Sequence, residues 1–568
     1  AMLTPLLLAT TLSGATGAYE DLGVARLAPE NTFFYAEVSD LPAVVKRWAA
    51  TGVGKLLMDG KSVDEALEPI RSQVADELDI DLDDVKLPSD AGFVAYTVLD
   101  EELGVDMPAW MAYVSWKDDE AMAKAAFDEQ LKELDLEYEQ ERLRGRDLYI
   151  IETEVELPDL DEVMMDAMPM PMMMGDSSMM DDAFRKVFVV RDGSLIVASS
   201  EPLAIDRAFK IIDGGSAKTL ADSESFQTME DMTSGTPDLQ VGLLTEPLGA
   251  FIKPIAGPTF AAGMPFIRAI FGDITGWGFY GTVGRDGNVL ASGQNISFNG
   301  GPQGIMKLLD VATPVGAIPG YIPEEAMSYG RMNFDFKNLV PTINEIIAGL
   351  PEAEAEQLQQ ATQMFGPMLQ TATETLGPAM HIFTTEGDDE FSMTRVTVAI
   401  PSSDTKKLDQ VVSMFGPMGG FQPRDFNGDT IYTDPMDEFG TFAIGVGAGS
   451  LLIGDVNGVE AILRSAGQSD LPSLARSGVA REVQRRMPSG DLMSWAFWDM
   501  QKIYGLMSTN PAFKDGSETG PSLLGLQTGL MPDVELSELA ERIGPQWSRG
   551  RSTTTGFDCR FGLMDGGK

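Results

Sequence analysis

The stretch KVFVVRDGSLIVASSEPLAIDRAFKII, Lys186 to Ile212, decides the fold. Apolar residues on both sides of its Asp-Gly turn predict two paired strands, and the apolar spacing after Pro202 predicts a helix that packs on them. A second stretch, TFAIGVGAGSLLIGDVNGVEAILRSAG from Thr441 to Gly467, follows the same plan. Its recurrence far along the chain indicates a repeated architecture.

Other segments repeat in the same order. The matched pairs are residues 31–51 with 326–346, 186–212 with 441–467, and 219–252 with 473–506. Within the first pair, Asp40 and Asp335 are each predicted to cap a helix. Within the last pair, Asp238 matches Asp491. The shared order predicts an internal duplication.

The predicted fold class is α+β, a tandem duplication of a domain with a largely antiparallel sheet flanked by helices. Short turns join most of the predicted strands and helices are interspersed irregularly, which favours this class over a doubly wound parallel sheet. We expect a first repeat domain over residues 19–310 and a second over 326–568. The Pro- and Gly-rich residues 311–325 are expected to link them.

Residues 1–18 are similar to the apolar core and cleavage region of a signal peptide, without its usual basic start. The apolar run is too short to span a bilayer, and no later run is long enough. The sequence therefore predicts an exported chain that is periplasmic, cell-surface or extracellular. It also predicts a truncated N-terminus and no transmembrane span in the mature chain.

Charge and cysteine content exclude several classes of function. The chain has 87 acidic and 41 basic residues, a formal net charge of -46, which disfavours nucleic acid as a partner. The single cysteine, Cys559, excludes an internal disulfide framework and a multi-cysteine zinc site.

A methionine-rich insertion near residues 155–184 distinguishes the first copy, because the second copy joins the matching strands by a shorter connection. Proline and glycine interrupt the run, so it has no helical or strand period. Three interpretations are open: a surface insert whose composition has no chemical role, an adaptable docking loop, or a Cu(I) site built from thioethers. The speculative Cu(I) ligands are Met164, Met165, Met168, Met170, Met172, Met173, Met174, Met179 and Met180.

Other motifs are better explained by structure than by chemistry. The lone histidine, His381, begins a predicted strand and is expected to be structural. The Asp79–Asp84 run lacks the glycine that an EF-hand needs at its sixth position, which disfavours Ca²⁺. Gly445–Ser450 leads into a strand, so it predicts a hairpin turn rather than a nucleotide site. The sequon at Asn295 is of a kind that occurs by chance.

Three segments together carry a family resemblance. LDIDLDDVKLPSDAGFVAYTVLD (Leu78 to Asp100), SLIVASSEPLAIDRAF and TLADSESFQTMEDM resemble a domain-of-unknown-function family of uncharacterised exported bacterial proteins, built from repeated strand and helix units. The resemblance covers most of residues 31–252 and, more faintly, the second copy. It implies export and a repeated fold, and it implies no particular activity.

We find no catalytic motif, and expect a non-catalytic binding or structural protein of the cell envelope or exterior, with no bound cofactor. Its partner would be an unidentified protein or envelope component, bound where two related domains form a groove. One alternative is a periplasmic Cu(I)-binding protein that uses the methionine loop. Another is a hydrolase with two convergent carboxylates of perturbed pKa at the domain interface.

Overall fold

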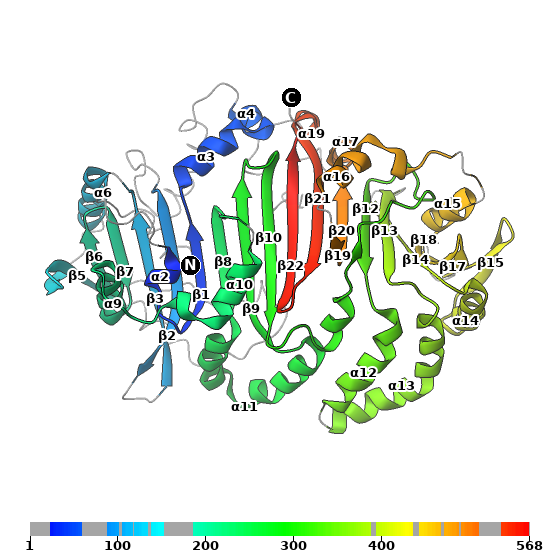
Figure 1. Ribbon diagram of the computed structural model, residues 1–568, viewed down its shortest axis with the longest axis horizontal. Helices are drawn as coiled ribbons and strands as arrows, with labels where there is room; N and C mark the ends of the chain where they lie inside the picture. Colours follow the sequence, from blue (N-terminus) through cyan, green and yellow to red (C-terminus); the bar gives the residue numbers. More distant parts are fainter. Residues whose placement is uncertain are drawn as a thin grey trace.

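The computed structural model describes residues 23–58, 88–100, 105–117, 119–133, 138–152, 186–233, 235–350, 352–387, 394–434, 442–466, 468, 471–487, 490–509 and 536–566. Residues 1–18, the methionine-rich insertion and the Asp79–Asp84 run lie outside these ranges. Within the described part, helices flank an antiparallel sheet, which confirms the predicted α+β class (Figure 1).

Twenty of the described strands form one continuous sheet (Figure 1), and the other two pair with each other. Its first half runs from the edge inward as β4 (Tyr138–Leu143), β5 (Arg146–Glu152), β6 (Lys186–Asp192), β7 (Leu195–Ser199), β3 (Val105–Ser115), β2 (Asp90–Asp100), β1 (Thr32–Val38), β8 (Leu239–Leu244), β9 (Ile274–Val283) and β10 (Asn288–Phe298). The second half continues outward as β22 (Gly556–Asp565), β21 (Ile543–Ser552), β20 (Ser494–Trp498), β12 (Ser328–Asn333), β13 (Ala379–Glu386), β14 (Thr394–Pro401), β18 (Ser450–Asp455), β17 (Phe442–Gly447), β16 (Asp429–Thr433) and β15 (Gln422–Phe426).

The two halves meet where β10 pairs with β22, and Gln294 lies opposite Cys559 there. Counted outward from this junction, each strand of the first half has a counterpart in the second half at the same place in the order of strands along the chain. Each half ends in a hairpin at its outer edge. The stretch from Lys186 to Ile212 forms β6, β7 and α9 (Pro202–Ile212). Its match forms β17, β18 and α15 (Val456–Ala466), the same order of elements.

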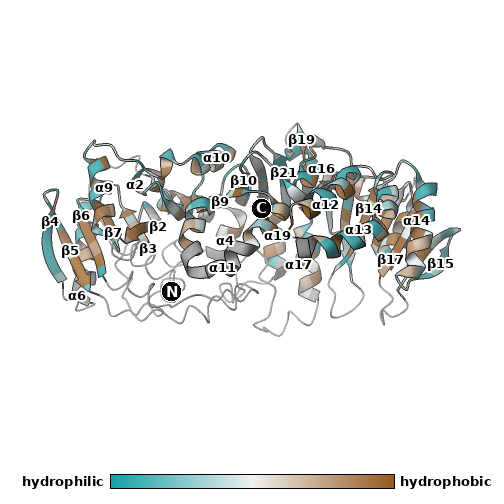
Figure 2. Cartoon of the chain, turned by 90° about the horizontal axis from the view of Figure 1, so that it is seen from below, coloured by the Kyte–Doolittle hydropathy of each residue, from teal (hydrophilic) through white to brown (hydrophobic). Residues whose placement is uncertain are grey.

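Helices cover both faces of the sheet, as Figure 2 shows from below. The front face of Figure 1 carries α2 (Val24–Leu27), α9, α10 (Glu224–Met232), α15 and α16 (Gly478–Arg486) over two apolar cores, one in each half. The back face carries α6 (Glu120–Glu133), α14 (Thr405–Met418), α17 (Met500–Thr509) and α19 (Leu536–Arg542). The remaining larger helices are α3 (Leu41–Ala50), α4 (Gly52–Met58), α11 (Thr245–Phe271), α12 (Leu339–Ala348) and α13 (Glu352–Thr373).

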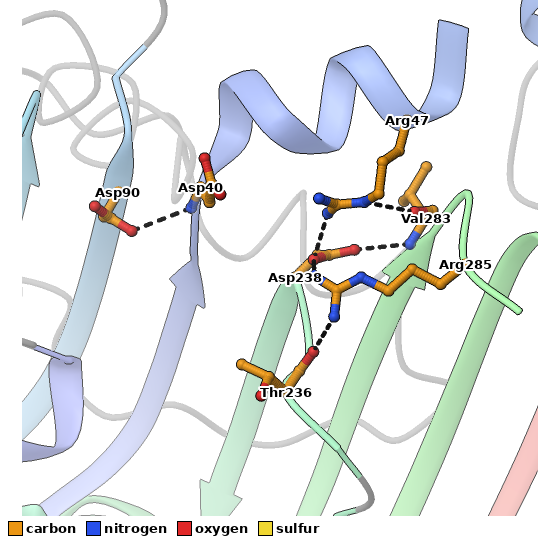
Figure 3. Close-up of polar contacts among 7 residues, drawn as sticks. All are labelled: Asp40, Arg47, Asp90, Thr236, Asp238, Val283 and Arg285. Carbon is orange, nitrogen blue, oxygen red and sulfur yellow. Dashed lines mark hydrogen bonds and ion pairs between the residues drawn. The ribbon is translucent and has the colours of Figure 1, made fainter. Parts of the chain in front are cut away.

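Two predicted local features have different outcomes. Asp335 caps its helical turn as expected, because its side chain accepts a hydrogen bond from the Asn338 backbone N–H. The predicted cap at Asp40 is wrong: Asp40 has a left-handed φ of 50°, and its side chain makes no cap bond. Its backbone N–H instead donates to Asp90 Oδ1 at 3.1 Å, as Figure 3 shows.

Residues 311–325, the expected linker, contribute to the fold. They include β11 (Thr313–Pro314), which pairs with β19 (Asp491–Leu492). The guanidinium of Arg331 donates to Pro314 O at 2.9 Å and to Thr313 Oγ1 at 2.8 Å. Within the described residues, no helix combines the length and apolar character needed to cross a membrane.

Aromatic rings on the front face lie over glycines directly opposite them on the neighbouring strand. The pairs are Tyr113 with Gly92, Tyr35 with Gly242, Tyr280 with Gly293, and Trp547 with Gly562. A Cβ at Gly92 would lie 2.2 Å from Tyr113 Cε1. Because Tyr113 is buried, its ring has little room to move away.

Gly92→Ala is therefore expected to lower the free energy of unfolding by about 1–3 kcal/mol, the usual range for overpacking. Gly281→Ala is the matched control within a strand, because its Cβ would meet its nearest neighbour at 3.8 Å, an ordinary contact. Urea unfolding followed by circular dichroism measures both. Equal midpoints for the two variants would show that the ring over Gly92 is not fixed.

Candidate functional site

Three arginines gather on the front face at the junction of the halves. Arg549 on β21 lies directly opposite Arg560 on β22, and Arg551 lies opposite Asp558. Directly opposite residues in an antiparallel pair project to the same face, so these side chains share one surface. We call Arg549, Arg551 and Arg560 the central arginine cluster.

Asp558 organises one side of the cluster. It is buried and accepts hydrogen bonds from Arg560 Nε at 3.0 Å and from Tyr280 Oη at 2.7 Å. The Arg560 guanidinium also lies over the Tyr280 ring, 5.7 Å from its centroid. Arg560 is therefore held in place by a carboxylate and an aromatic ring.

The Arg549 guanidinium lies over the Trp547 ring, 5.6 Å from its centroid, but it has no carboxylate like Asp558 beside it among the described residues. Its Nε is buried and has no hydrogen-bond acceptor among the described residues. Burial lowers the pKa of the Arg549 guanidinium, and the positive charges of Arg560 and Arg551 lower it further. Like charges that face each other across strands destabilise a sheet. The cluster thus opposes folding stability, which is typical of residues kept for binding.

Two further buried donors without acceptors lie in the same cross-strand row as Arg549. Arg331, Trp495 and Arg549 pair in register across β12, β20 and β21. The Nε of Arg331, the Nε1 of Trp495 and the Nε of Arg549 are all buried and lack acceptors within the described residues. Each unsatisfied donor costs about 1–3 kcal/mol. Trp495 is enclosed in the apolar core, so an acceptor from outside the chain can relieve this cost only at the partly buried arginines.

The lone histidine lies at the end of the same row. His381 is opposite Arg331, is buried, and its Nδ1 makes a 2.8 Å hydrogen bond with Tyr329 Oη. Burial lowers the pKa of His381 to about 4, and the charge of Arg331 acts in the same direction. A neutral, enclosed imidazole agrees with the structural role expected for it.

Three other candidates from the sequence lie in environments that do not favour a chemical role. Burial raises the pKa of the Cys559 thiol, and the charge of Asp558 raises it further, so Cys559 is a weak nucleophile. Asn295 is buried, and its amide nitrogen donates to Met229 O at 3.1 Å and Thr233 Oγ1 at 2.9 Å, which leaves no room for a glycan. Gly445–Ser450 spans the hairpin turn between β17 and β18.

The matched aspartates have different environments. Asp238 is buried and accepts hydrogen bonds from Arg47 Nη2 at 2.7 Å, Arg285 Nη2 at 2.5 Å and the Val283 backbone N–H at 2.8 Å (Figure 3). These bonds tie α3 and the β9–β10 turn to the start of β8. Asp491 is exposed. We assign the Asp238 cluster a structural role.

A groove in the second half provides another concave surface. Its volume is about 790 Å³, and it is lined by α15, α17, the end of β13 and the residues just before β12. It contains Glu325, Glu386 and Lys502, and Lys502 Nζ donates to the carbonyl oxygens of Glu324 and Ala326 at 2.7 and 3.1 Å. The size suits a small molecule.

Metal binding has no support in the described residues, where no three His, Cys, Asp or Glu side chains gather as a metal site. The methionines Met164 to Met180 lie outside those residues, so the Cu(I) hypothesis stays a prediction. Sequence reasoning missed the central arginine cluster. The signal that could have revealed it is the alternating Arg549-Gly550-Arg551 in a strand of a strongly acidic chain.

No family model, curated protein or solved structure matches this chain. The resemblance to exported bacterial proteins of repeated units therefore remains a hypothesis.

Proposed function

We propose that this chain is an exported, non-catalytic binding protein of the cell envelope or exterior, built by duplication of an α+β domain. Its central arginine cluster would hold an anionic group of the ligand. The observation that carries the proposal is the Arg549 guanidinium, which faces Arg560 across two strands and lacks an acceptor for its Nε in the described structure.

Two further observations support this proposal. The corresponding strand order of the two halves, read outward from β10 and β22, is the order expected after a duplication. The cluster lies at that junction, where a groove between related domains was expected from the sequence.

The chemistry of the cluster favours binding over catalysis. Arginine stays protonated, so it is a poor general acid or base. Its planar fork matches the geometry of carboxylate and phosphate groups. His381 and Cys559, which could act in catalysis elsewhere, are kept neutral by burial.

Arg549→Gln is expected to weaken the binding of citrate or phosphate at least tenfold, because a charged hydrogen bond contributes about 1.5–3 kcal/mol. The ligand-free variant should also be more stable than the wild type, by up to about 1 kcal/mol, since the facing charges are gone. Calorimetric titration and thermal unfolding measure the two effects.

Arg424→Gln is the matched control, with the same change of charge. Arg424 lies on the edge strand β15 and pairs with Glu460, far along the sheet from the junction. The Arg424→Gln variant should bind citrate and phosphate as tightly as the wild type does. If Arg549→Gln and Arg424→Gln bind these anions as the wild type does, the proposed function is wrong.

A further inference from the structure

We infer that the first half binds a monovalent cation about as large as a water molecule, potassium or ammonium, between α10 and the sheet. This site is separate from the central arginine cluster, and the inference goes beyond the proposed function. It follows from a small cavity, from a buried oxygen that lacks a donor, and from the residues that the second half places at the same position.

The cavity lies between the front face of the sheet and α10. Residues of β1, β8, β9 and β10 line it on one side, and residues of α10 line it on the other. Its volume is about 10 Å³, which holds one water-sized group. The side chains that line it include Tyr35, Phe226, Glu230, Tyr280 and Asn295.

Asn295 contributes a carbonyl oxygen that lacks a partner. The residue is 1% exposed, and its Nδ2 donates to Met229 O and to Thr233 Oγ1. Turning the amide over would place Oδ1 against the carbonyl oxygen of Met229, so the present orientation is the stable one. Oδ1 has no donor among the described residues. A buried oxygen of this kind gains from a donor or a cation supplied from outside the chain.

The charges around the cavity favour a cation. Glu230 is exposed and carries a carboxylate, and no basic residue is among the described residues that line the cavity. Burial raises the pKa of the Tyr35 hydroxyl, and the negative charges of Glu230 and Glu37 raise it further. The rings of Tyr35 and Phe226 meet edge to face, with centroids 5.3 Å apart, and aromatic rings attract cations.

The ligand set suits a monovalent ion better than a divalent one. Calcium takes six to eight oxygen ligands, usually several carboxylates among them, and magnesium keeps much of its water. The cavity holds one water-sized group, and the described residues nowhere gather three His, Cys, Asp or Glu side chains. Potassium and ammonium match one carboxylate, neutral oxygens and aromatic rings.

Two cross-strand rows occupy corresponding places in the two halves. Gly242 is the fourth residue after Asp238, and Trp495 is the fourth residue after the matched Asp491. The rows are Gly242, Gly278 and Asn295 in the first half, and Trp495, Arg549 and Arg560 in the second. The sheet therefore places the cavity of the first half where the second half has part of the central arginine cluster.

The second row contains positive charges of its own. Arg549 stands at the position of Gly278, and Arg560 stands at the position of Asn295. Glycine at 278 leaves space that an arginine side chain would fill. A cation bound in that space would take the place of a guanidinium group, which favours an ion over a neutral water molecule.

Diffraction at the rubidium absorption edge locates such an ion directly, because rubidium is close to potassium and ammonium in size. Crystals of the whole chain in rubidium chloride should show an anomalous peak beside Asn295 Oδ1. Gly278→Ala should remove the peak. Its Cβ would lie 3.5 Å from Met229 Sδ, an ordinary contact, so the variant should fold while its methyl group takes up the cavity. A water molecule without an anomalous peak in the wild type would overturn the inference.

Thermal unfolding separates a bound ion from general screening of the net charge of -46. Potassium or ammonium chloride should raise the wild-type Tm by at least about 1 °C more than tetramethylammonium chloride, whose cation is too large for the cavity. The larger of the two shifts identifies the preferred ion. Gly278→Ala should lose this difference. Gly281→Ala, the same change on the same strand, should keep it, because its Cβ meets its nearest neighbour at 3.8 Å.

Glu230→Gln tests the carboxylate and should weaken the apparent potassium affinity at least threefold. Asp231→Asn is the matched control, because Asp231 is the neighbouring exposed carboxylate on α10 and is not part of the lining. It should respond to potassium as the wild type does. Equal responses of the wild type to potassium, ammonium and tetramethylammonium would overturn the inference, as would a potassium response that Glu230→Gln leaves unchanged.

Discussion

Asp238→Asn is expected to lower the free energy of unfolding by about 3 kcal/mol. The carboxylate is buried and is the shared acceptor for Arg47, Arg285 and a backbone N–H. Removing one member of a buried charge network leaves the other charges unpaired, which costs about 3–5 kcal/mol. The partial exposure of both guanidiniums, 26% and 35%, places the expected loss at the lower end.

Chemical denaturation at neutral pH measures this loss, and Asp206→Asn is the matched control. Asp206 also pairs with an arginine, Arg144, but the Asp206 side chain is 36% exposed, whereas that of Asp238 is 4% exposed. Exposed pairs contribute little, so the control should unfold close to the wild type. If the two variants lose the same stability, Asp238 is not the anchor of α3 and the β9–β10 turn.

His381 is expected to make the protein less stable as the pH falls from about 6.5 to about 4. Burial holds the folded-state pKa at about 4, whereas the ordinary value is 6.5. The unfolded chain therefore binds a proton that the folded chain excludes. The stability is fully present above pH 6.5, is lost progressively through this window, and changes no further below about pH 4. The shift corresponds to about 3 kcal/mol.

His381→Gln tests this pH dependence, because glutamine can still accept a hydrogen bond from Tyr329. The chain has one histidine, so no other imidazole titrates in the same window. Denaturation at a series of pH values should show the wild type losing more stability than the variant between pH 6.5 and pH 4. Parallel curves for the two proteins would mean that His381 is protonated without penalty.

The fold class was predictable because alternating apolar residues around tight turns persist along the chain. The stretch from Lys186 to Ile212 contains its own turn, strands and helix, and these local signals agree with the structure. The predicted cap at Asp40 failed because its backbone adopts a left-handed conformation, and its N–H donates to Asp90, a residue distant in sequence.

The candidate site was harder to predict because it depends on register between distant strands. A shift of one residue between β21 and β22 would move Arg560 to the other face of the sheet and separate it from Arg549. The pairing of β10 with β22 likewise joins the middle of the described chain to its last strand. Asp238 and Asp491 match in sequence, but the two arginines that contact Asp238 set its environment.

The place of β21 and β22 in the chain has a consequence for biosynthesis. They are the last described strands, yet β22 is the one that pairs with β10 of the first half. A ribosome would therefore release almost all of the described elements before the central arginines could reach their partners. We expect ligand recognition to appear abruptly, once β22 has been synthesised, so that chains lacking this strand would not compete for the ligand.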